Sequence, residues 1–398
     1  MKKFYYLILA ALVMAACETS PSGGGGGGGG GGSHHSTVDG IPSDDEAKPN
    51  PDITGADTII NLPGVQTTVT TEGDDIVIRL DMTGIVNPET GEFLKLIGSG
   101  EYQNVYVEVD GKKKGIEVTN LSEGSGATVK ADLVFLVDNS GSMDDEADTI
   151  ANGIDAWSKL LANSGLDIRF GVVGYDGEIT GALDIATSAE LSAFLNKEYT
   201  YGTSRTHYFE GPNAAELQSL APSYYNGGDM DECGMAALHF ANNHFNFRSG
   251  ANRIYVNFTD EPNYHMERDT LRTSWLINNW ESQLGTVHSV FSAMEGTEAE
   301  VKEYVDYNAW GSSTIWDYPW DMATHTGGTK LFANYDFSGV KLSDLPVTGA
   351  MQNSYIIRFT NVEEFMDGQE HQVHITIMTP DGSVAGEITI TVVFGTAA

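Results

Sequence analysis

Apolar and polar residues alternate with a period of two in two separated parts of the chain. The first part is 66–130, where the apolar positions from Ile76 to Met82 are spaced by two; the second is 349–396, where Val373–Ile377 shows the same spacing. Because successive side chains of a strand point to opposite faces, this pattern predicts antiparallel strands buried on one side. Neither part has enough strands for an independent sandwich, so we expect one antiparallel β-sandwich made from both.

Residues 131–348, between these two parts, follow a different pattern. Unbroken apolar runs such as Leu133–Val137 and Ile254–Phe258 are typical of strands buried on both faces of a parallel sheet. They alternate with helical stripes, as in Ile150–Leu161, where apolar residues recur at spacings of three and four. The alternation predicts a doubly wound α/β domain, with a mostly parallel sheet and helices on both faces, inserted into the sandwich.

Oxygen-bearing side chains directly follow two of the apolar runs. Asp138, Ser140 and Ser142 come after the first run, and Asp260 comes after another. The carboxyl ends of parallel strands meet at one edge of a sheet, which is where open α/β sheets bind ligands. Hard oxygen donors with few positive neighbours suit Mg²⁺. The alternative for both loops is a helix N-cap, formed by Ser142 or Asp144 in the first and by Asp260 in the second.

The loop Asp138–Ser142 resembles the Asp-x-Ser-x-Ser loop of von Willebrand factor A (vWA) domains, their metal-ion-dependent adhesion site (MIDAS). Asn257–Glu261 is similar to the strand end from which vWA domains supply a further acid. Gly227–Gly234 resembles a loop of the integrin β-subunit I-like domain, in which a glutamate contacts the metal. The resemblance implies that the central domain is a vWA domain, which is Rossmann-like, with a metal site similar to that of integrin β subunits.

The resemblance also implies a set of metal ligands and a cofactor, Mg²⁺ or Mn²⁺. The implied ligands are Asp138, Ser140, Ser142, Asp229, Glu232 and Asp260. Glu232 matches the integrin glutamate and Asp229 is a neighbouring acid, and the sequence does not rank one over the other. Asp145 and Glu146 fall where integrin β subunits keep acids for an adjacent regulatory ion, which implies a second site, for Ca²⁺. Acids in a first helical turn also complement the helix dipole, which is the alternative for this pair.

The first residues form a targeting segment. Lys2-Lys3 precede the apolar run Phe4–Val13, which is too short to span a bilayer. Met14–Cys17 looks like a bacterial lipobox, so 1–17 is predicted to be a lipoprotein signal peptide with lipidation at Cys17; the alternative is an ordinary secretory signal. Residues 18–65 contain ten consecutive glycines and are predicted to be a flexible linker. We therefore expect a lipid-anchored protein of the cell envelope, at the outer membrane, displayed on either its surface or its periplasmic side.

The net charge of the chain argues against two classes of partner, nucleic acids and anionic lipid surfaces. The chain of 398 residues has 21 basic and 56 acidic residues and a formal net charge of -35. Nucleic acids are excluded as partners because their binding needs Lys and Arg to neutralise phosphates. An anionic lipid surface is disfavoured for the same reason, which leaves the lipid as the expected attachment to the membrane. With Cys17 lipidated, Cys233 has no partner for an intrachain disulfide, and we expect it to be a small buried apolar residue.

In adhesive vWA domains a carboxylate from the partner fills a coordination position of the metal. The resemblance therefore implies a metal-dependent binding protein that acts in adhesion or recognition and takes a protein partner that donates a carboxylate. The predicted partner-binding rim consists of the aromatic residues near the acidic loop in sequence, Tyr201, His207, Tyr208, Tyr224 and Tyr225. The alternative is an envelope scaffold or a fimbria-associated component whose vWA domain docks a neighbouring protein.

Catalytic motifs are absent from the sequence. It contains no H-E-x-x-H, no G-x-S-x-G, no phosphate-binding glycine loop and no recognisable pair of catalytic acids. No histidine is tied by motif to the acids of the predicted metal loops. We therefore expect a binding protein and not an enzyme.

Overall fold

The structure, a computed structural model, describes most of the chain after residue 37. The described ranges are 38–124, 126–162, 166–196, 209–224, 232–308, 316–337 and 341–395. The predicted signal peptide, with Cys17, and the glycine run lie outside them. Within these ranges no helix is both long and apolar enough to cross a bilayer. Residues 35–398 group into a single unit, to which every statement below refers.

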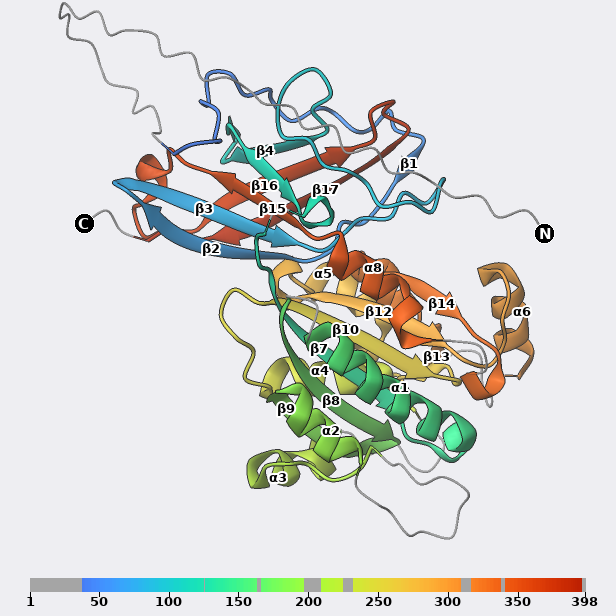
Figure 1. Cartoon of the computed structure of the whole chain (residues 1–398). Helices are drawn as coiled ribbons and strands as arrows, with labels where there is room; N and C mark the ends of the chain where they lie inside the picture. The colour runs from blue at the N-terminus through green and yellow to red at the C-terminus, as the bar shows by residue number, and fades with distance from the viewer. Residues whose placement is uncertain are drawn as a thin grey trace, which may run out of the picture. The chain divides into compact units, whose positions relative to one another are not determined.

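Two β-sheets combine strands from both ends of this unit (Figure 1). One has the order β1 (Thr58–Ile59), β17 (Val384–Val392), β16 (His371–Met378), β4 (Val105–Val109) and β5 (Lys112–Lys113). The other has the order β2 (Val65–Glu72), β3 (Asp75–Met82), β15 (Tyr355–Phe359) and β6 (Glu117–Asn120). Neighbouring strands are antiparallel except β1 with β17. Leu80, Val107 and Ile375 belong to one apolar cluster, so the two sheets share a core.

Residues 38–64, which the sequence analysis assigned to a flexible linker, pack against these sheets. Ile41, Ile53 and Leu62 are buried. The side-chain amide of Asn50 donates hydrogen bonds to His374 O (3.2 Å) and Thr376 Oγ1 (3.0 Å). These apolar residues are far apart in the sequence and follow no period, which is why the pattern of the segment gave no sign of the packing.

Strands β6 and β15 are direct neighbours, with Asn120 opposite Tyr355. The chain leaves the four-stranded sheet at the end of β6 and re-enters it at the start of β15. The two ends of the intervening segment are therefore held side by side.

A six-stranded sheet forms the centre of this segment (Figure 1). Its order is β14 (Lys330–Phe332), β12 (Thr286–Phe291), β10 (Asn252–Thr259), β7 (Lys130–Asp138), β8 (Asp167–Asp176) and β9 (Glu178–Ala186). All neighbouring strands are parallel except β8 with β9, which are antiparallel. The unbroken apolar runs of the sequence therefore form parallel strands, and the predicted mixed α/β class is confirmed.

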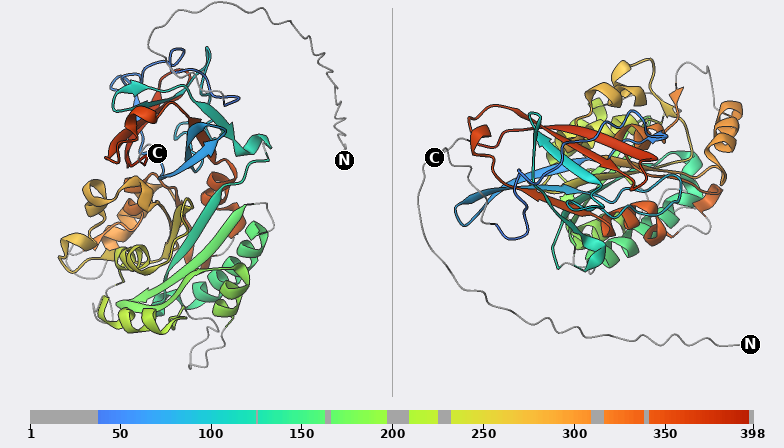
Figure 2. Two further views of the ribbon diagram at one scale, coloured as in Figure 1. Left: turned by 90° about the vertical axis from the view of Figure 1, so that its left-hand side faces the viewer. Right: turned by 90° about the horizontal axis from the view of Figure 1, so that it is seen from above.

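Helices cover both faces of this sheet (Figure 2). On one face, Leu133, Phe135 and Val137 share a core with α1 (Asp144–Ala162), α2 (Ser188–Leu195) and α8 (Pro346–Gln352). On the other face, Val134 and Leu136 share a core with α3 (Ala215–Tyr224), α4 (Gly234–His244), α5 (Leu276–Asn279) and α7 (Asp321–Thr326). The remaining elements are α6 (Glu298–Asn308) and a two-stranded ribbon of β11 (Asn263–Tyr264) and β13 (Trp316–Asp317).

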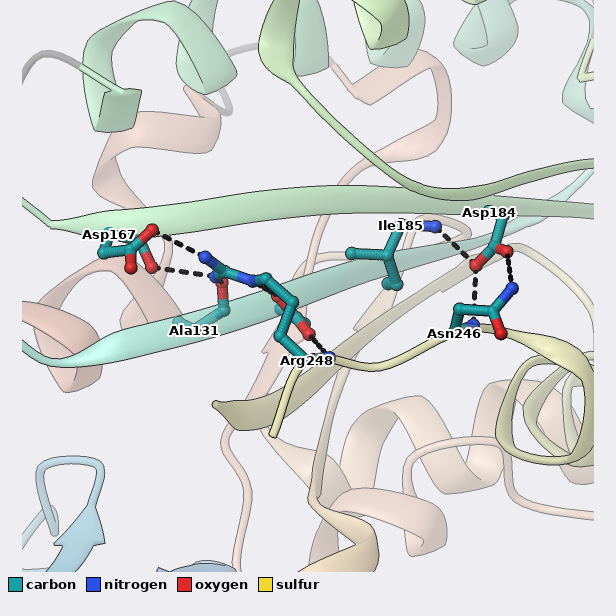
Figure 3. A network of polar contacts seen from close by, with 7 residues as sticks. Ala131, Asp167, Asp184, Ile185, Asn246 and Arg248 are labelled. Atoms are coloured by element: carbon teal, nitrogen blue, oxygen red, sulfur yellow. Dashed lines mark hydrogen bonds and ion pairs between the residues drawn. The ribbon is translucent and has the colours of Figure 1, made fainter. Parts of the chain in front are cut away.

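At the amino edge of the sheet, Arg248 holds two strands together (Figure 3). Its backbone N–H donates to Asp132 Oδ2 (2.7 Å) and its Nε to Asp132 Oδ1 (2.6 Å). Nη1 donates to Asp167 Oδ1 (2.6 Å), and Nη2 donates to Ala131 O (2.8 Å). Asp132 is fully buried and is the third residue of β7, whereas Asp167 starts β8. The guanidinium thus neutralises a buried carboxylate and fixes the entry of the chain into β10.

Candidate metal site

The candidate site lies at the opposite, carboxyl edge of the same sheet. Strand β7 ends at Asp138, and α1 begins at Asp144 after a short loop. The adjacent parallel strand β10 ends at Thr259, in a register that places Phe258 opposite Val137. Because the two strands run side by side and stop at the same level, their terminal polar side chains meet.

The structure brings together Asp138, Ser140, Ser142 and Asp260. Ser140 Oγ and Ser142 Oγ are 2.9 Å apart, and the Ser142 hydroxyl donates to Asp260 Oδ1 over 3.0 Å. The backbone N–H of Ser140 donates to Asp138 Oδ1 (2.9 Å). Four of the six residues that the sequence analysis named as metal ligands thus lie at one edge of the sheet.

Thr259 is a member of the site that sequence reasoning missed. Its hydroxyl donates to Asp138 Oδ2 over 2.6 Å, on the side of the carboxylate opposite to Ser140 N. Asp138 is fully buried, so these two donors fix its carboxylate group. Thr259 is the last residue of a parallel strand, and the strand-end rule that selected Asp260 also applies to it.

Glu232 and Glu261 add further acids to this edge. Glu232 lies just before α4, and its burial, followed by the charge of Asp138, raises the pKa of its carboxyl group. Burial and the charge of Asp138 also raise the pKa of Glu261 to about 7. Glu261 was not predicted, although it directly follows Asp260. Asp229, the other predicted acid of this loop, lies outside the described residues, so the structure does not compare it with Glu232.

Burial and the proximity of the acids to one another determine the electrostatics of the site. Burial is the largest cause that raises the pKa values of Asp138 and Asp260, and the charge of Asp138 adds to the rise at Asp260. Hydrogen bonds from Thr259 and Ser140 act in the other direction on Asp138. Among the described residues no lysine or arginine forms an ion pair with Asp138, Asp260 or Glu261.

The donor set fits a hard divalent cation. Carboxylate and hydroxyl oxygens are the ligands that Mg²⁺ and Mn²⁺ take in proteins, and a cation would offset the negative charge of the buried acids. Over the described ranges, no group of three or more His, Cys, Asp and Glu side chains is arranged to hold a metal ion. A metal ion here would therefore depend on the hydroxyl oxygens of Ser140 and Ser142 as well as on acids.

The predicted second cation site falls at the start of α1. Asp145 and Glu146 are both in its first turn. Glu146 is fully buried, and its charge is one of the causes that raise the pKa of Asp260. Glu146 thus belongs to the electrostatic surroundings of the candidate site. A separate Ca²⁺ ion at this pair stays a prediction.

The predicted aromatic rim falls mostly outside the described residues, which exclude Tyr201, His207, Tyr208 and Tyr225. Tyr224 is the last residue of α3. The described residues instead show a cavity of about 280 Å³ beside the site, whose lining includes Ser142, Asp260, Glu261, Phe291, Tyr304 and Tyr335. The Tyr335 hydroxyl donates to the backbone oxygen of Ser142 over 3.1 Å.

Cys233 is buried at the N-cap of α4, as expected from the sequence. Burial raises the pKa of its thiol to about 12, so the sulfur is protonated at neutral pH. Its thiol lies 3.4 Å from Asn263 Oδ1. A protonated, buried thiol acts as an apolar residue and not as a metal ligand.

Comparisons with known proteins leave the family of the chain unassigned. No family model matches it, and no curated protein is similar to it in sequence. Among solved structures, it is similar to proximal thread matrix protein 1 from the mussel byssus, at 15% identity and a TM-score of 0.33, over 57% of this chain and 47% of that one. It is also similar to the pilus adhesin SpaC from Lactobacillus rhamnosus GG, at 10% identity and a TM-score of 0.30, over 82% of this chain and 47% of that one. A third is the vWF domain of the type V pili tip protein Mfa5 from Porphyromonas gingivalis, at 14% identity and a TM-score of 0.21, over 36% of this chain and 42% of that one. In each case the chain spans less than half of the solved protein.

Proposed function

We propose that this chain is a cell-envelope protein that binds a protein partner through a divalent-metal site of the MIDAS type, in a vWA domain inserted into a β-sandwich. One observation carries the proposal. Ser142 Oγ lies 2.9 Å from Ser140 Oγ and 3.0 Å from Asp260 Oδ1, beside the buried Asp138. A structural N-cap needs one of these oxygens. It does not need three, together with further acids.

Each residue has a separate part in this proposal. The oxygens for Mg²⁺ or Mn²⁺ come from Ser140, Ser142 and Asp260. The buried carboxylate of Asp138 adds negative charge next to them. Thr259 and the Ser140 N–H hold the Asp138 carboxylate in one orientation. Glu232 is the described acid of the adjoining loop. A bound metal supplies positive charge and a coordination position for a carboxylate of the partner.

The cavity next to the site offers a contact surface for such a partner. Tyr304 and Tyr335 are partly exposed there, at 37% and 52%. Aromatic side chains of this kind contribute much of the binding energy in protein interfaces. Attachment to the outer membrane through Cys17 is part of the proposal and rests on the sequence alone. Binding, and not catalysis, is the proposed activity.

The test is calorimetric titration of Mg²⁺ and Mn²⁺ into the protein and into Ser142→Ala and Asp260→Asn. Each variant removes one oxygen donor, so we expect at least a tenfold loss of affinity. Asp269→Asn is the matched control, because the Asp269 side chain is 94% exposed and forms its ion pair with Arg272 (3.6 Å). Wild-type affinity in both site variants would refute the proposal.

A pull-down with and without EDTA then tests the partner. We expect a protein that is retained by the wild type with Mg²⁺ and lost with EDTA or in Ser142→Ala. A partner retained equally in all samples would instead support the scaffold or fimbria-associated role.

A further inference from the structure

A second cavity lies between α4 and the segment 268–284. Its volume is about 410 Å³. Its lining includes His239, Asn242, Asn243, Arg268, Trp275 and Trp280. Trp280 is hydrogen-bonded to Gly285, which directly precedes β12, so this part of the wall lies near the amino end of that strand. The residues that line this cavity differ from those that line the cavity beside the candidate metal site.

The aromatic wall of this cavity is held in place by the protein itself. Trp280 Nε1 donates to Gly285 O over 2.8 Å, and its ring meets Tyr255 edge-on with centroids 6.0 Å apart. Trp275 meets the His239 ring edge-on with centroids 4.8 Å apart. Both tryptophans are half-buried, so each is anchored while part of it remains accessible. A ligand that stacks on these two rings would therefore bind with little loss of side-chain conformational entropy.

His239 is an uncharged part of this wall. Its Nε2 lies 2.7 Å from Thr270 O, which fixes the ring relative to the segment that carries Arg268. Burial lowers the pKa of His239, so the imidazole is neutral near pH 7.

Polar groups face the same cavity. Asn242 Oδ1 accepts a hydrogen bond from Arg253 Nη1 (3.3 Å), so the oxygen of this amide is the atom engaged by the protein. Asn243 and Arg268 are exposed at the rim. No Asp or Glu is among the described residues that line the cavity, in a chain whose net charge is -35.

The residues that line this cavity limit the chemical class of ligand that it can bind. A cationic ligand would find no carboxylate, and a phosphorylated ligand would find one guanidinium in a strongly acidic protein. A purely apolar ligand would displace water from the amide groups and from Arg268, which is unfavourable. A pyranose ring meets each requirement, because its C–H face packs on an indole while its hydroxyls bond to amide and guanidinium groups.

We propose that this cavity is a saccharide-binding site, in which Trp275 and Trp280 form the stacking surface and Asn242, Asn243 and Arg268 bond to ring hydroxyls. The site does not depend on a metal ion. It would give the protein a second binding activity, in a cavity that shares no lining residue with the one beside the candidate metal site.

The experiment is titration of the full chain with a panel of methyl glycosides of glucose, mannose, galactose, N-acetylglucosamine and fucose, at millimolar concentrations and with EDTA present. Intrinsic tryptophan fluorescence and calorimetry report on binding. We expect at least one glycoside to shift the emission and to bind with an affinity that is unchanged by EDTA. If no glycoside binds, the proposal is wrong.

Variants assign the binding to this cavity by calorimetry. Trp275→Ala should weaken the affinity about tenfold, because it removes the stacking surface. Arg268→Gln, at an exposed position, should weaken it about threefold and keeps the test valid if Trp275→Ala does not fold. Trp316→Phe is the control, because Trp316 lies in β13 and does not line the cavity. Glycoside binding that survives both cavity variants, or that disappears with EDTA, would overturn the assignment.

Discussion

Asp132 and Asp138 lie near the two ends of the same strand, and both are fully buried. Asp132 forms a hydrogen-bonded ion pair with Arg248 over 2.6 Å. Asp138 receives hydrogen bonds from Thr259 and the Ser140 N–H, which are neutral groups. Burying a carboxylate is unfavourable unless it is paired or hydrogen-bonded. At one end of β7 the buried carboxylate is paired with a guanidinium, and at the other end it accepts hydrogen bonds from neutral groups.

The difference separates a structural end of the sheet from the end that carries the proposed metal site. At the amino edge the protein provides both charges of the ion pair between Arg248 and Asp132. At the carboxyl edge no described lysine or arginine forms an ion pair with Asp138, Asp260 or Glu261, and a bound divalent cation would supply positive charge there. An arrangement that is incompletely compensated by its own chain is typical of binding sites.

The largest expected effect comes from breaking the amino-edge pair. Arg248→Met leaves Asp132 buried and unpaired, and we expect it to lower the free energy of unfolding by about 3–5 kcal/mol. Urea denaturation measures the change. The double variant Arg248→Met with Asp132→Asn should recover much of the loss, because it removes the uncompensated charge. Equal stability of the single and double variants would show that the charge of Asp132 is not the cause.

A smaller effect is expected at the carboxyl edge, and it should depend on metal. Saturating Mg²⁺ at one hundred times its dissociation constant should stabilise the wild type by about 2.7 kcal/mol. Asp138→Asn should lose this gain and, in EDTA, should be at least as stable as the wild type, because it replaces a buried carboxylate for which the described residues provide no ion-pair partner. Asp132→Asn is the matched control and should be less stable with or without metal. Urea denaturation in EDTA and in Mg²⁺ measures the stability of the three proteins. If Asp138→Asn were strongly destabilised in EDTA, the Asp138 carboxylate would be as important for folding as that of Asp132, and the two ends of β7 would not differ.

The smallest effect tests an ion pair at the surface of the β-sandwich. His371 bonds to Asp110 (2.7 Å) and Asp367 (3.0 Å), and these hydrogen bonds raise the pKa of its imidazole. Lys112 and Lys114 face the neighbouring Phe365 ring and are the nearby cations. A raised pKa in the folded state means that the stabilisation is complete below the pKa of the unfolded chain and is lost as pH rises through the folded value.

His371→Gln should therefore be less stable than the wild type at about pH 5.5, by under about 1 kcal/mol, and closer to it at about pH 8.5. Thermal unfolding at the two pH values measures the difference. A gap between wild type and variant that widens with rising pH would contradict the assignment.

The carboxyl edge could be predicted from sequence, whereas the amino edge could not. Asp138 and Asp260 each follow an apolar run, and parallel strands bring such positions together by a general rule. Arg248 and Asp132 are separated by 116 residues, and neither belongs to a motif. Their pairing depends on where the loop before β10 returns to the sheet, which no local pattern encodes. Arg248 was accordingly absent from the sequence-based predictions.

Two further features also lay beyond the sequence pattern. Tyr335 bonds to Ser142 from a 3-10 helix after β14, and Tyr304 lies on α6, so only the folded chain shows that both line the cavity beside the site. The packing of residues 38–64 was hidden because Ile41, Ile53 and Leu62 are isolated apolar positions. The lipid at Cys17, the metal and the partner remain predictions.

The pairing of Asn120 with Tyr355 makes residues 121–354 topologically the loop of a β-hairpin. Closing a loop costs only about 0.6 kcal/mol more for each doubling of its length, so two small sheets can carry a very large insertion at low cost. The same geometry makes the fold modular. A short turn joining Asn120 directly to Tyr355 would preserve every strand of both outer sheets, and another domain with closely spaced ends could be grafted at the same position.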